Sequence, residues 1–266
     1  MQNTFVKIPI NYIFNKTDKK IELLLYRCLK FLNYSKLDST RTSIAELVTM
    51  CKCSLKAKNS DRNPMGQIRS CLQDFLDKGY IQWNNSQLPD SANTLLKVNK
   101  FFGLDFKLDR EVFDPPDKFV ILYDGEWAKI MSTPTRTSYV HLLRTFLYIK
   151  YWQSDDVVTN TYLGCYKTEQ AMASDLGFTI TQLNNYLAIL IEQELLSKRI
   201  TGSYKTLNEI RNAPNIYTLV SDEKRNRRVS DTLQLLKTTY DVGDEGFMPI
   251  VYKDKCIRKD GQNYNE

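Results

Sequence analysis

Residues 173–196 combine two helical patterns with a glycine between them, in the segment ASDLGFTITQLNNYLAILIEQELL. Gly177 suits the left-handed residue that ends a helix, and Thr179 with Gln182 three positions later forms a capping-box pattern. The second helix places four aliphatic residues on one face: Leu183, Leu187, Leu190 and Ile191. A tight glycine turn forces the two helices to cross closely. The segment therefore predicts a helix-turn-helix.

The residues on either side extend this motif. Ala173, four positions before the glycine, is small enough for the two helices to approach each other. Thr168 suits the N-cap of the first helix, and Glu169 is favourable in its first turn. The other expected elements are a helix over Thr137–Trp152, a short strand over Thr161–Tyr166, and a hairpin of Ser197–Ile200 and Asn215–Val220 that turns near Gly202-Ser203. This is the order of a winged helix-turn-helix.

The first half of the chain repeats the order. Its expected elements are an amphipathic helix over Lys19–Asn33, a capping box at Ser43–Glu46, a helix from Pro64, a strand after Gly79, and a second strand at Leu95–Asn99. A shift of about 115 residues brings the apolar positions of the two longer helices into register, as in an internal repeat. The first unit differs in its turn, because Lys52–Asn63 adds a long basic segment.

These patterns predict a mainly α fold with small β wings, an α+β protein of two tandem winged helix-turn-helix domains. We place winged-helix domain 1 at 1–102, a linker with two prolines at 103–118, winged-helix domain 2 at 119–221, and a basic C-terminal extension at 222–266. Phe119–Tyr123 is expected to add a strand to the second domain, and Ser230–Thr239 to form a further helix.

A helix that enters the major groove presents the outward residues of its N-terminal part to base edges. In the second unit these are Thr179, Thr181, Gln182, Asn184 and Asn185, and the wing offers Lys198, Arg199, Tyr204 and Lys205 to phosphates. In the first unit the corresponding residues are Gln67, Arg69, Ser70 and Gln73, with Lys56, Lys58 and Arg62 in the basic turn. The formal net charge of +6 is compatible with a polyanionic partner.

Each of these assignments has a simpler alternative. Gln182 can serve only its cap, and Asn184 and Asn185 can form a merely solvated helix face. The cluster Arg225–Arg228 is typical of a charged surface, and Lys52–Arg62 of an insertion without a DNA contact. The tandem units can also bind protein instead of DNA.

Catalytic patterns are missing, and we expect neither an enzyme nor a cofactor. The chain contains no phosphate-binding loop and no Gly-x-Ser-x-Gly elbow. Cys51 and Cys53 lack zinc spacing and, like Cys71, are interpreted as small core residues; no metal is expected. His141 with Arg144 only superficially matches a recombinase element, and a structural histidine is the simpler interpretation. Without a leader pattern or a long apolar run, a cytoplasmic protein that does not enter the membrane is expected.

The arrangement resembles the Rep initiators of theta-replicating plasmids, which carry tandem winged helices. Its single units are also similar to the amino-terminal domains of phage replisome organisers and DnaD-like proteins. The resemblance rests on Thr168–Leu196 with its wing and, more loosely, on Ser43–Trp83. It implies binding to repeated origin sites in double-stranded DNA, one unit per major groove, with host replication proteins and a second copy of the chain as partners.

The predicted function is therefore sequence-specific DNA binding by the replication initiator of a plasmid, phage or other mobile element. A transcription regulator is the first alternative, although such proteins usually add a sensor domain, and none is evident here. The second alternative is a replisome interaction module that does not bind DNA. The long turn of the first unit makes the second unit the better candidate for reading base sequence.

Overall fold

The computed structural model describes residues 4–14, 21–33, 40–52, 64–83, 99–109, 118–133, 138–207, 209–243 and 246–250. It is a mixed α/β structure in which helices pack against small antiparallel sheets, consistent with the predicted α+β class. The candidate residues Lys56, Lys58 and Arg62 and most of the strand expected at Leu95–Asn99 lie outside the described residues.

The first half, up to residue 109, is built on a three-stranded sheet in the order β2-β4-β3. Its elements are β1 (Phe5–Pro9), α1 (Ile10–Phe14), α2 (Glu22–Leu32), β2 (Thr40–Thr42), α3 (Ile44–Met50), α4 (Pro64–Asp77), β3 (Ile81–Trp83) and β4 (Leu104–Leu108). Only the serine half of the capping box predicted at Ser43–Glu46 is present, because the Ser43 side chain accepts a hydrogen bond from the backbone amide of Glu46 while the Glu46 side chain bonds a different residue. The Glu46 carboxylate accepts a bond from the Thr42 hydroxyl at 2.8 Å.

The position of β4 corrects the sequence prediction. Residues 103–118 were expected to be a linker. Instead, residues 104–108 pair with both β2 and β3, while Asn99 lies in a turn and accepts the amide of Phe102. The sequence LDFKL alternates at the strand period, and it buries Leu104, Phe106 and Leu108 on one face. The alternation was overlooked because Asp105 and Lys107 resemble linker residues.

The second half begins at residue 118 and repeats the order with two additions. Its elements are β5 (Phe119–Tyr123), α7 (Asp124–Ser132), α8 (Tyr139–Tyr151), β6 (Ser154–Asp156), β7 (Thr161–Leu163), α9 (Glu169–Leu176), α10 (Ile180–Glu192), β8 (Leu196–Arg199), β9 (Ser203–Lys205), β10 (Ile210–Asn212), β11 (Ile216–Leu219) and α11 (Arg225–Thr239). The strand β5 and the helices α8, α9, α10 and α11 were predicted, although α11 begins five residues earlier than expected. The extra strands β6, β9 and β10, which have no counterparts in the described part of the first half, are one addition, and α11 is the other. The predicted strand Thr161–Tyr166 corresponds to β7.

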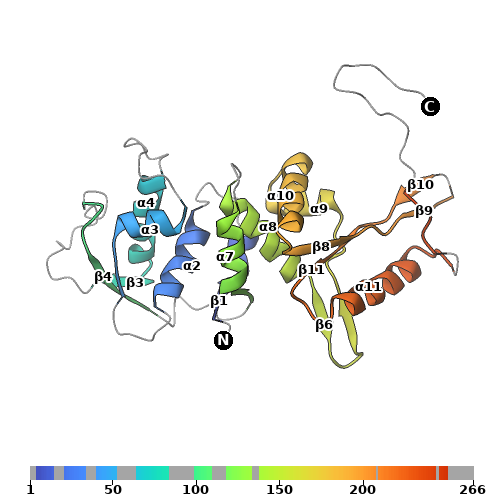
Figure 1. Ribbon diagram of the computed structural model, residues 1–266, viewed down its shortest axis with the longest axis horizontal. Coiled ribbons are helices and arrows are strands. Elements are labelled where there is room, and N and C mark those ends of the chain that lie inside the picture. The colour runs from blue at the N-terminus through green and yellow to red at the C-terminus, as the bar shows by residue number, and fades with distance from the viewer. Residues whose placement is uncertain are drawn as a thin grey trace, which may run out of the picture.

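The wing is longer than the sequence indicated. Its hairpin was expected to turn near Gly202-Ser203, but the ribbon continues through that point. Strands β8 and β11 form the inner half, and β9 and β10 form the outer half, which turns at Thr206–Glu209 (Figure 1). The inner half joins the preceding segment through a bridge between Cys165 and Tyr217.

The two halves of the chain are tied together where their leading segments meet. Strands β1 and β5, the first element of each half, pair antiparallel around Lys7 and Ile121. Helix α1 packs on α8 and α9 of the second half, so residues 5–14 do not pack only within the range 1–102. A second contact joins α2 of the first half to α7 of the second, because the Arg27 guanidinium lies 2.5 Å from the Asp124 carboxylate. One continuous apolar core results.

Candidate nucleic-acid interface

Helices α9 and α10 meet at a left-handed glycine, as predicted. Gly177 has φ 71° and ψ 35°, and the amide of Phe178 donates to the carbonyl of Ala173 at 2.8 Å. Ala173 is buried at the crossing, where a larger side chain would separate the helices. From α8, buried Arg144 donates to the carbonyl of Leu176 at 3.1 Å and to that of Ile13 at 2.9 Å. The end of α9 is therefore held to the first half of the chain.

The N-terminus of α10 is closed by the predicted capping box. The Thr179 hydroxyl accepts the amide of Gln182 at 3.2 Å, and the Gln182 side-chain oxygen accepts the amide of Thr179 at 3.0 Å. The alternative proposed for Gln182, that it serves the cap, is confirmed. Only its amino group stays available to a ligand, because the carbonyl oxygen is already in use.

The outward face of α10 carries polar side chains that do not contribute hydrogen bonds to the described part of the fold. Thr181, Asn184 and Asn185 are exposed and have no side-chain hydrogen bond to any residue that the structure describes. The opposite face is buried, with Leu183, Leu187 and Leu190 at spacing of one helical turn. The helix has no charged residue before Glu192, so its face offers neutral donors and acceptors beside the positive end of the helix dipole.

The four wing candidates separate into two pairs. Arg199 and Lys205 are exposed as expected. Lys198 instead forms an ion pair with Glu169 at 3.0 Å, and Tyr204 stacks on Tyr240 with ring centroids 4.3 Å apart. Two candidates thus have internal partners that the sequence prediction did not include, because both partners are more than 25 residues away in the chain.

Glu169 connects α9 to the wing through hydrogen bonds that the sequence did not indicate. Its Oε1 atom accepts hydrogen bonds from the Tyr217 hydroxyl at 2.6 Å, the Asn215 amide at 3.1 Å and the Lys198 ammonium group. Partial burial opposes ionisation of the carboxyl group, but these donors outweigh it and lower the pKa of Glu169 below its ordinary value of 4.5.

Replacing Glu169 with Gln is expected to lower the free energy of unfolding at pH 7 by about 1–2 kcal/mol, since the charge that attracts three donors is lost. A lowered folded pKa gives stability that is present above pH 4.5 and is lost as the pH falls below it. Urea unfolding of both proteins at pH 7 and at several values below 4.5 measures this difference, which should shrink with acidification. A difference independent of pH would contradict the role of the ionised Glu169 carboxylate.

The corresponding face of the first half is less open. Gln67, Arg69, Ser70 and Gln73 on α4 are only half-exposed. The Gln73 amide also donates to the Asp77 carboxylate at 2.8 Å, one turn along the same helix. The structure therefore makes α10 the more accessible of the two helices, and both lie on the upper side of the molecule in Figure 1.

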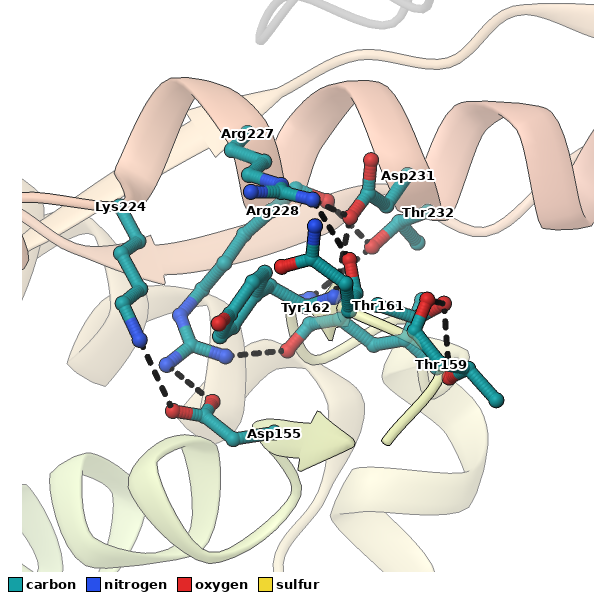
Figure 2. A network of polar contacts seen from close by, with 12 residues as sticks. Asp155, Thr159, Thr161, Tyr162, Lys224, Arg227, Arg228, Asp231 and Thr232 are labelled. Carbon is teal, nitrogen blue, oxygen red and sulfur yellow. Dashed lines mark hydrogen bonds and ion pairs between the residues drawn. The ribbon is translucent and has the colours of Figure 1, made fainter. Parts of the chain in front are cut away.

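The basic cluster after the wing is largely a structural element, and the interpretation of Arg225–Arg228 as a charged surface is wrong for Arg228. Figure 2 shows its guanidinium enclosed between α11 and the β6–β7 hairpin. It pairs with Asp222 and with Asp155 at 2.5 Å, and it donates to the carbonyls of Ser154 and Leu163 at 3.1 Å. Asp222 lies just before the basic cluster, and the other three partners lie on the β6–β7 hairpin. The charge pattern of the cluster itself therefore did not indicate that Arg228 is buried.

The same network anchors the rest of α11 to β7. The Asp231 carboxylate accepts the amide of Tyr162, and the Thr232 hydroxyl accepts the amide of Gly164, both at 2.9 Å (Figure 2). Arg227 donates to the carbonyl of Asn160, and Lys224 lies 3.9 Å from Asp155. Helix α11 is therefore held against the β6–β7 hairpin by several polar contacts.

His141 and the cysteines occupy structural positions. The His141 Nδ1 atom lies 2.8 Å from the Tyr186 hydroxyl, and its ring packs on Phe178. Cys51 and Cys71 are buried in the core as interpreted, whereas Cys53 lies outside the described residues. In the part of the chain that the structure describes, no three His, Cys, Asp or Glu side chains are grouped to hold a metal ion.

No protein-family model matches the chain, and neither curated proteins nor solved structures show a significant match. Among the described residues, no helix combines the length and the apolar character needed to span a bilayer. The features that bear on function are therefore the geometry of α9, α10 and the wing.

Proposed function

We propose that the chain is a sequence-specific double-stranded DNA-binding protein made of two tandem winged helix-turn-helix units. The support is the repeated order of the elements. In each half a strand and a helix lead to a three-helix group, which is followed by antiparallel strands. In this proposal α4 and α10 are the recognition helices, and the strands that follow them are the wings.

The observation that carries the proposal is the outer face of α10. Thr181, Asn184 and Asn185 project from a capped, well-packed helix, and no described residue uses their side chains. The side-chain amide of one asparagine can form two hydrogen bonds with adenine, one to N6 and one to N7. A threonine hydroxyl can bond either a base edge or a phosphate. Arg199 and Lys205 on the wing supply positive charge for the flanking phosphates.

Within this class, the role we propose is replication initiation for a plasmid, phage or other mobile element, in the cytoplasm, with host replication proteins as partners. The repeated plan occupies both halves of the described chain, which favours two contacts with neighbouring DNA sites over one reader joined to a sensor. A transcription regulator is the second candidate, and it shares the same α10 surface.

Selection from a sheared DNA library that includes the neighbourhood of the gene separates these roles. The full chain is incubated with the fragments at moderate salt, and the bound fragments are sequenced. Several direct repeats in tandem would identify an origin and support an initiator, whereas one inverted repeat over a promoter would identify a regulator. Absence of enrichment would contradict DNA recognition and leave a protein-binding module.

Binding is expected to weaken steeply with salt, because phosphate contacts release counterions. Three or four contacts by residues such as Arg199 and Lys205 predict a slope of about −2.7 to −3.6 in log K against log salt. Affinity should then fall roughly 40- to 150-fold between 50 and 200 mM salt. Fluorescence anisotropy with a labelled duplex measures this slope. A flat response would count against any DNA role.

A further inference from the structure

The outer half of the wing, formed by β9 and β10, is stabilised by contacts with residues outside the hairpin. Strands β9 and β10 pair over only three residues each, from Ser203 to Lys205 and from Ile210 to Asn212. A two-stranded ribbon of this size is marginal in water by itself. In Figure 1 this ribbon extends away from α10, beyond the inner strands β8 and β11. Its orientation must therefore be set by other parts of the chain.

A segment after α11 pairs with the free edge of β9. The amide of Ser203 donates to the carbonyl of Met248 at 2.8 Å, and the amide of Met248 donates back to Ser203 at 2.9 Å. The segment crosses directly over Gly202, where an added Cβ would lie 2.4 Å from the Met248 carbonyl oxygen. Gly202 also has φ 118°, a conformation that side-chain-bearing residues rarely adopt. Glycine at this position permits the crossing.

An aromatic stack connects the same ribbon to α11. The ring of Tyr204 on β9 lies parallel to Tyr240 at the end of α11, with an interplanar angle of 28°. The ring of Phe247 lies edge-on to Tyr240, with ring centroids 6.4 Å apart. Because α11 is itself anchored to β7 by Asp231 and Thr232, the stack joins the ribbon to a fixed support.

We propose that Tyr240, Phe247 and Met248 form a brace that orients the outer wing for binding to DNA. The inference depends on the proposed DNA-binding function and adds positioning residues to it. The brace holds β9 so that Lys205 is presented in one direction, which reduces the entropy lost when this side chain meets a phosphate. Tyr204 then acts through its ring, as the contact between wing and brace.

The test compares Tyr240→Ala with Tyr240→Phe in the full chain. The alanine variant loses the stack, whereas the phenylalanine variant keeps the ring and serves as the matched control. Hydrogen exchange of the β9 and β10 amides should accelerate in Tyr240→Ala and stay near wild type in Tyr240→Phe. DNA affinity should fall about three- to tenfold in the alanine variant alone, the cost of ordering one or two side chains.

A double-mutant cycle with Lys205→Ala tests whether the brace acts through the wing. If it does, Tyr240→Ala should have little further effect on affinity once Lys205 is replaced, and the two effects should not add. Additive effects, or unchanged exchange in β9 and β10, would overturn the brace. If wild-type protein selects no DNA while Tyr240→Ala still accelerates exchange, the DNA function fails and the mechanical brace stands.

Discussion

Replacing Arg228 with Met is expected to lower the free energy of unfolding by about 1.5–3 kcal/mol, the range for losing hydrogen bonds to a charged group, because Arg228 is buried while its partner Asp155 is 42% exposed. The substitution leaves the Asp222 carboxylate without its buried partner, and the carbonyls of Ser154 and Leu163 lose their donor. Methionine fills much of the volume of the arginine side chain. The decrease in the free energy of unfolding therefore reflects the missing guanidinium group more than the creation of a cavity. Urea unfolding followed by circular dichroism gives the magnitude.

Arg227→Met is the matched control, one residue earlier on the same helix. The Arg227 side chain is 47% exposed, and both its ion pair with Asp231 and its hydrogen bond to the carbonyl of Asn160 lie at the surface, so its loss should cost only about 1 kcal/mol. Hydrogen exchange adds spatial information, because Arg228→Met should release α11 and the β6–β7 hairpin first. Equal losses in the two variants would show that burial of Arg228 does not determine its contribution.

Replacing Asn184 and Asn185 together with Ala should abolish most specific DNA binding while the fold stays intact. Each bidentate contact with a base is worth about 1–3 kcal/mol, so the selected site should bind at least roughly thirtyfold more weakly. Nonspecific binding should change little, because the phosphate contacts of Arg199 and Lys205 are retained. Anisotropy titrations with the selected duplex and with a scrambled duplex measure both quantities.

Gln234→Ala provides the control for this substitution, since it removes an exposed side-chain amide from a different helix, α11. The melting temperature of all three proteins should agree, because exposed side chains without partners contribute little to stability. Unchanged affinity in the double variant would reject α10 as the recognition helix, even if the protein binds DNA by another surface.

Much of the local structure could be predicted because its causes lie within a few residues. The cap of Thr179 and Gln182 closes over three positions, and Gly177 ends α9 through its own backbone freedom. The exposed side of α10 followed from the same periodicity that buries Leu183 and Leu187. The shift that relates the two halves also anticipated α4 and α10, although the role of their outer faces in binding stays a prediction.

The errors have a common physical origin in contacts between distant residues. Strand β4 was expected to be part of a linker, because its pairing with β2 joins positions more than 60 residues apart. The extension of the wing past Gly202 depends on Met248, which no local pattern connects to the hairpin. The internal partners of Lys198 and Tyr204 were not predicted either, because Glu169 and Tyr240 lie on other elements.

By itself the sequence determined that helices α8, α9 and α10 form, where α9 ends and α10 begins, and which face of α10 is apolar. These properties depend on caps, glycine and the helical period, which act over short distances. Only the tertiary structure decided which charges are available to a ligand. Arg228 and Ser154 meet across 74 positions of the chain, and burial there converts a basic cluster into an internal support. The cost of leaving such a charge unpaired depends on its surroundings, and those surroundings exist only after folding.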